Sequence, residues 1–135
     1  MPRVCWRLHG GRPVIEVTFH PPTDGQGFSR TLLADTGGGS QLSSWHVILS
    51  EDDCRQLALS APASVRLGGA YAGDFHVFVV RASIGVLGIT RRLIAVAVPA
   101  ALLPAGLDGL AGFRFLSSFN YGNFGYPNQF CLETL

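Results

Sequence analysis

The chain has 135 residues, enough for a hydrophobic core, so we expect a single domain over residues 1–135. Only 14% of the residues are charged, against about a quarter in a typical soluble domain, so we expect a second copy of the chain to cover part of the surface. The formal net charge is +1 and the basic residues are scattered, which argues against nucleic acid and anionic membranes as partners.

The first half of the chain predicts one hairpin and one helix. Residues 14–19 are β-branched and partly alternating, and a turn rich in proline and glycine separates them from a second strand, residues 28–34. Ser50 then precedes three acidic residues, and apolar residues recur at helical spacing, so residues 50–59 are predicted to form a short capped helix. We expect Asp52 and Asp53 to be solvated capping residues at its start.

The second half predicts further strands and a second helix. Residues 64–67 and 74–80 flank a stretch of small residues and form a second predicted hairpin. The remaining predicted elements are strands at 86–89, 93–98 and 129–135 and a helical segment at 113–119. Six or seven short strands with two short helices predict a mainly β domain, in the form of a barrel or a sandwich.

The stretch TLLADTGGGS, residues 31–40, places an acid at the end of an apolar strand. An ionised carboxylate at the edge of a core is costly unless it is hydrogen-bonded, so Asp35 needs a reason to be there. One interpretation is a tight polar turn, since aspartate bonds locally and glycine permits positive φ. Another is a phosphate-binding turn like that of sugar kinases, actin and hexokinase, but that family needs two lobes, which 135 residues do not supply.

Three segments in a fixed order support a third interpretation. They are LLADTG at residues 32–37, LGGAYAGDF at 67–75 and DGLAGFRFL at 108–116. Together these segments resemble the retropepsin-like aspartic proteases, whose single domain is a closed β-barrel with a flap hairpin and one or two short helices. The resemblance implies an aspartic endopeptidase with Asp35 as its catalytic residue. It also implies that Thr36 and Gly37 complete the active-site loop, with the Thr36 hydroxyl bonding across a dimer and Gly37 leaving room beside the carboxylates.

The resemblance also implies a flap that closes over an extended peptide. The residues it assigns to the flap and to substrate binding are Gly68, Gly69, Ala70, Tyr71, Ala72 and Gly73. Hydrolysis without a metal needs two carboxyl groups that share one proton and act on a water molecule. Because one chain offers one such aspartate, the resemblance implies a homodimer in which the two copies of Asp35 meet on the two-fold axis. It implies no cofactor and no metal.

Two positions depart from the family pattern. Gly38 stands where these enzymes usually carry alanine or serine, and Ala111 replaces a larger aliphatic residue. Both changes could weaken catalysis while keeping the fold. The alternative function is therefore a catalytically weak or inactive module that dimerises or binds peptides.

Other candidate residues receive structural interpretations. The four histidines lack metal-ligand spacing, and Asp108 is predicted to make a turn. The three cysteines are an odd number without C-x-x-C spacing, which argues against a disulfide framework and a zinc site and favours a cytoplasmic protein. Because two adjacent arginines interrupt the most apolar region, residues 84–103, we expect no membrane span.

Overall fold

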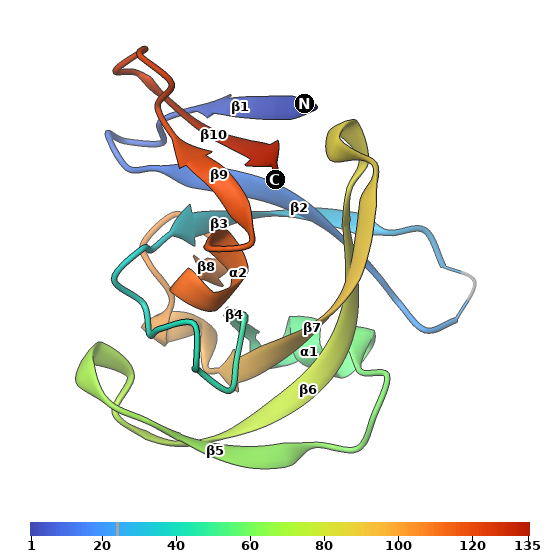
Figure 1. Ribbon diagram of the computed structural model, residues 1–135. Coiled ribbons are helices and arrows are strands. Elements are labelled where there is room, and N and C mark those ends of the chain that lie inside the picture. The colour runs from blue at the N-terminus through green and yellow to red at the C-terminus, as the bar shows by residue number, and fades with distance from the viewer. Residues whose placement is uncertain (24) are drawn as a thin grey trace.

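The computed structural model describes residues 1–23 and 25–135, and strands are its main regular elements (Figure 1). Within these residues the strands are β1 (Arg3–Arg7), β2 (Val14–His20), β3 (Phe28–Ala34), β4 (Val47–Ser50), β5 (Ala63–Leu67), β6 (Gly73–Ile84), β7 (Ile89–Val98), β8 (Gly109–Ala111), β9 (Phe119–Gly122) and β10 (Gln129–Thr134). The helices are α1 (Glu51–Leu57) and α2 (Phe113–Leu116). Residue 24, in the predicted turn between β2 and β3, lies outside the described residues.

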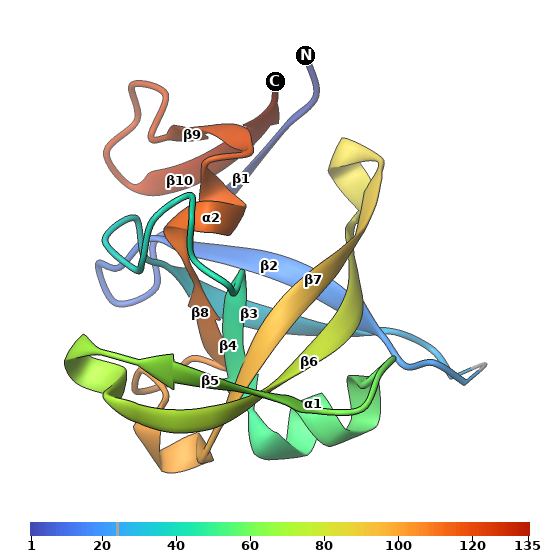
Figure 2. The ribbon, with the colours of Figure 1, turned by 60° about the horizontal axis from the view of Figure 1, so that its bottom comes forward.

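Six strands close into a barrel. Each strand pairs with the next in the order β2, β3, β8, β4, β7 and β6, and β6 returns to pair with β2. Strand β5 extends the sheet beyond β6. Strands β1, β10 and β9 form a separate sheet next to the barrel, on the side where both termini lie (Figure 2). The prediction of a mainly β, closed barrel with two short helices is confirmed.

Strand β2 shows why the alternation in the sequence becomes a barrel wall. Val17 and Phe19 are fully buried in the main core, whereas Glu16 between the apolar residues is exposed. The strand pairs with β3 in antiparallel register, with Val14 opposite Leu33. The predicted first hairpin is therefore confirmed.

Helix α1 begins at the predicted cap. The Ser50 hydroxyl accepts a hydrogen bond from the backbone N–H of Asp53, and the first turn carries three acidic residues. Cys54 and Leu57 are fully buried on the inner side of the helix. The cap fixes the direction in which the chain leaves β4.

Asp53 is not solvated, contrary to the prediction. Its side chain is only 10% exposed, and both carboxylate oxygens accept hydrogen bonds from Arg30, at 2.8 and 3.0 Å. The hydrogen bond to Asp53 raises the pKa of Arg30. Burial acts in the opposite direction but is the smaller effect, so the pKa stays above its ordinary value. A carboxylate at a helix start can be buried here because β3 supplies a paired guanidinium.

Two other predicted elements differ in extent. Of the strand predicted at residues 86–89, only Ile89 is in a strand, as the first residue of β7: Gly85–Leu87 is a 3₁₀ turn, and Gly88 follows it with φ +67°. This turn joins β6 and β7, which are paired at nine residue positions, the last being Ile84 opposite Ile89. The helix predicted at residues 113–119 ends at Leu116, and Phe119 begins β9.

The prediction that the cysteines are unpaired is wrong for two of them. Cys5 lies opposite Cys131 in the antiparallel register of β1 and β10, and the two form a disulfide with a Cα–Cα distance of 4.0 Å. Burial raises the pKa of the remaining cysteine, Cys54, to about 12, so its reactive thiolate is disfavoured. The disulfide removes the argument for a reducing, cytoplasmic environment, because stable disulfides are typical of oxidising compartments.

Candidate active site

Asp35 lies immediately after β3, in a loop whose backbone contacts both β8 and the Asp35 side chain. Its backbone N–H donates to the carbonyl of Ala111 at 2.9 Å, which continues the parallel pairing of β3 with β8. The backbone N–H of Gly37 donates to Asp35 Oδ1 at 3.0 Å, and that of Gly38 donates to the Asp35 carbonyl, also at 3.0 Å. The carboxylate is therefore oriented by its own loop.

Close packing in this loop centres on Gly38 rather than on Gly37. A Cβ at Gly38 would lie 3.1 Å from both the carbonyl oxygen and Oδ2 of Asp35, whereas one at Gly37 would make an ordinary 3.5 Å contact with Oδ1. Within this one chain, the predicted need for space beside the carboxylate therefore falls on Gly38. Thr36 is exposed, and its hydroxyl is accessible to solvent or to a partner.

The segment of residues 112–113 contacts the Asp35 loop and supports it. The backbone N–H of Phe113 donates to the Gly38 carbonyl at 2.9 Å. A Cβ at Gly112 would lie 2.6 Å from the Trp45 ring and 2.8 Å from the Gly38 carbonyl, so only glycine allows this approach. Ala111 is fully buried in the main core, so its small side chain is packed rather than surrounded by solvent.

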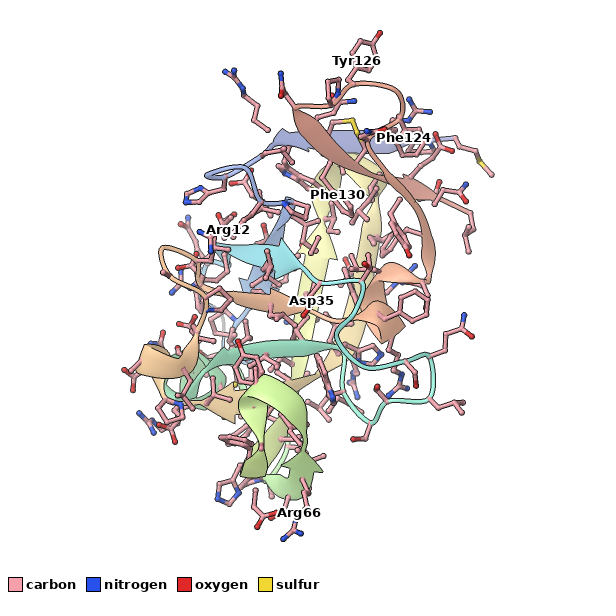
Figure 3. The ribbon with its side chains drawn as sticks, turned by 90° about the vertical axis from the view of Figure 1, so that its left-hand side faces the viewer. Arg12, Asp35, Arg66, Phe124, Tyr126 and Phe130 are labelled. Carbon is pink, nitrogen blue, oxygen red and sulfur yellow. A yellow bond between two sulfur atoms is a disulfide. The ribbon has the colours of Figure 1, made fainter. Side chains whose placement is uncertain are left out.

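The predicted flap is present. Strands β5 and β6 pair up to Leu67 opposite Gly73, and the 3₁₀ turn Gly69–Tyr71 forms the tip. An open cleft of about 330 Å³ lies between the flap and the Asp35 loop. It is lined by Asp35, Gly37, Gly38, Gly39, Trp45, Ile48, Leu67, Gly68, Ala70, Tyr71 and Leu110. Figure 3 shows Asp35 near the centre of this face of the molecule, with the flap below it.

Most of the predicted site residues therefore meet in one place. Thr36, Gly69, Ala72 and Gly73 belong to the same two loops but do not line the cleft. Trp45, in the loop before β4, and Ile48, on β4, line the cleft and were missed, because an apolar residue gives no local signal that it faces a cleft.

The electrostatics of the cleft are simple. Burial, with a contribution from the negative charge of Asp35, raises the pKa of Tyr71. Behind the Asp35 loop, burial and the charges of Arg114 and Arg91 lower the pKa of His46 to about 4. His46 Nδ1 accepts the backbone N–H of Ile94 at 2.9 Å, which fits a neutral imidazole.

Asp108 and the four histidines lie outside the cleft. Asp108 is predicted to make a turn; its Oδ2 accepts the backbone N–H of Thr31 at 2.9 Å, so this acid ties the segment before β8 to β3. In the part of the chain that the structure describes, no cluster of three or more histidine, cysteine, aspartate or glutamate side chains could hold a metal ion. None of the described helices is both long and apolar enough to cross a bilayer.

A solved structure has a similar fold. The crystal structure of a retropepsin-like aspartic protease from Rickettsia conorii superposes with a TM-score of 0.56 and covers 96% of this chain and 89% of its own. This chain has a retropepsin-like fold. The two sequences are 11% identical, so the comparison shows the retropepsin-like fold and nothing finer. No protein-family model matches the sequence, and no curated protein does.

Proposed function

We propose that this protein is an aspartic endopeptidase, formed by a single domain over residues 1–135 that acts as a homodimer. The observation that supports it is the position of Asp35, whose carboxylate lies in a cleft beneath a flap in a retropepsin-like fold. Of the residues that line this cleft, Asp35 is the one that carries a charge. A carboxylate in this position can act on a bound water molecule.

The chemistry requires a second copy of the chain. Two carboxyl groups about 3 Å apart cannot both ionise, so they share one proton, one acting as base towards water while the other donates to the peptide carbonyl. Each subunit would supply one Asp35, related by a two-fold axis. The exposure of Thr36 leaves its hydroxyl free to bond with the partner loop.

The proposed substrate is an extended peptide or protein segment, bound between the flap and the Asp35 loop. Apolar side chains and glycines form most of the cleft, so a peptide can align there as a strand. The proposal includes no cofactor, metal, nucleic acid or membrane.

The test compares wild type with Asp35→Asn on a diverse peptide mixture, with products identified by mass spectrometry from about pH 4 to 7.5, where such a pair can hold one shared proton. Asparagine is nearly isosteric but does not take up the proton, so we expect cleavage by wild type alone. Cleavage by neither protein, in samples shown to be folded and dimeric, would favour the alternative of an inactive peptide-binding module. Equal cleavage by both would exclude Asp35 as the catalytic residue.

A further inference from the structure

The flap tip is almost entirely exposed to solvent. Every residue from Gly68 to Asp74 is exposed except Tyr71, which is half-buried. The pairing of β5 with β6 ends at Leu67 and Gly73, so sheet hydrogen bonds do not reach the tip. Tyr71 is therefore the one side chain of the tip that ties it to the body of the subunit.

Tyr71 is partly buried and packs against a hydrophobic cluster whose buried members include Trp45, Ile48 and Leu110. These three residues line the same cleft as Asp35 and Tyr71. They come from the loop after Asp35 and from strands β4 and β8. The ring therefore joins the flap to the floor of the site.

Glycines shape the turn around Tyr71. Gly69 and Gly73 flank it with φ values of +65° and +146°, which only glycine adopts easily. A Cβ at Gly68 or Gly69 would meet no atom within 4 Å. Side chains at these two positions would meet open space, so Tyr71 is the tip residue whose side chain is packed against the rest of the molecule.

We propose that Tyr71 is a positioning residue, whose aromatic ring holds the flap closed over Asp35 by packing on Trp45, Ile48 and Leu110. The hydroxyl is not the anchoring group, because the neighbours that hold the side chain are apolar. Burial, with a contribution from the negative charge of Asp35, raises the pKa of this hydroxyl and keeps it neutral. The kinetic part of this inference rests on the proposed function, because closure of the flap over a peptide has meaning only if a peptide is bound.

Hydrogen exchange tests the anchor without any assay of activity. We expect Tyr71→Ala to speed amide exchange in the paired parts of β5 and β6, residues 63–67 and 73–77, by at least about tenfold, since an opening flap breaks the hydrogen bonds that protect these amides. Tyr71→Phe keeps the ring and should stay within about twofold of wild type. The matched control is Tyr126→Ala, which removes a 69% exposed tyrosine at the opposite end of the same face and should change nothing in the flap (Figure 3).

Kinetics with a peptide that wild type cleaves provide the second measurement. Tyr71→Ala should raise KM more than it lowers kcat, because the flap closes less often on bound peptide, and Tyr71→Phe should restore both. Unchanged flap exchange in Tyr71→Ala, or a Tyr71→Phe variant that behaves like Tyr71→Ala, would overturn the proposal. If wild type cleaves no peptide, the proposed function fails, whereas the exchange experiment still decides whether Tyr71 anchors the flap.

Discussion

Replacing both Cys5 and Cys131 with serine removes the covalent link between the first and last strands. The link spans 126 positions of sequence, so in the oxidised protein almost the whole unfolded chain is a closed loop. The chain-entropy relation for a loop of this length gives a stabilisation of about 5 kcal/mol at 25 °C. Native disulfides of small domains contribute about 2 to 5 kcal/mol, so we expect a loss in the upper part of that range.

The native structure should change little in this variant. Strand β1 remains paired with β10 over five positions, and Arg3 still donates two hydrogen bonds to Glu133, at 2.9 and 2.8 Å. Val4 and Trp6 still pack against the core. The loss should therefore come from the greater freedom of the unfolded chain.

Urea unfolding followed by circular dichroism measures the effect. Each protein needs its own m-value, because a cross-link makes the unfolded chain more compact. Wild type in dithiothreitol should match the double variant, and the double variant should not respond to dithiothreitol. A loss below about 1 kcal/mol would refute the reasoning, because it would mean that the cross-link hardly restricts the unfolded chain.

Two further predictions concern buried polar groups. Asp53→Ala leaves the Arg30 guanidinium without its carboxylate, so we expect the free energy of unfolding, measured with urea, to fall by about 2 to 3 kcal/mol. The control is Asp74→Ala, which removes one partner of an exposed ion pair and should have no measurable effect. An Asp53→Ala variant as stable as wild type would contradict the importance of this pair. For His46, the folded pKa of about 4 lies below the ordinary value of 6.5, so the unfolded chain binds the proton first and stability should fall as pH drops from about 6.5 to about 4. Urea unfolding across this pH range should show a smaller fall in His46→Asn, which accepts the same backbone hydrogen bond but does not titrate; equal falls would exclude His46 as the cause.

The elements that local pattern predicts are those whose stability is also local. The alternation of residues 14–19 becomes β2 because each second side chain faces the core, and Ser50 begins α1 because its hydroxyl caps the next turn. The glycine-rich stretch between β5 and β6 becomes the flap tip for a similar local reason. Asp35 was predictable because an acid after an apolar strand needs a local turn, and the Asp35 loop provides one.

The elements that were missed or misplaced depend on contacts distant in sequence. Strand β8, only three residues long, exists because β3 and β4 lie on either side of it. A Cβ at Gly109 would clash with the Ile48 carbonyl, so glycine is needed for β8 to lie this close to β4. No local pattern in the sequence reveals this requirement. Val86 is apolar and β-branched, as in a strand, yet it is 69% exposed at a hairpin tip.

The same limit applies to pairs of side chains. The link between Cys5 and Cys131 depends on the register of the first and last strands, which cysteine spacing does not encode. The burial of Asp53 depends on Arg30, which lies 23 positions earlier. Both pairings follow from the way distant segments come together in the fold rather than from neighbouring residues.

The loop that carries Asp35 is held by Ala111 and Phe113, which the ribosome adds long after it. A growing chain that has passed residue 40 contains the whole stretch DTGGGS but lacks the strand and the loop that set its geometry. The arrangement around Asp35 can therefore form only after residue 113 has been added. Order of synthesis thus delays the formation of the cleft until both segments are present.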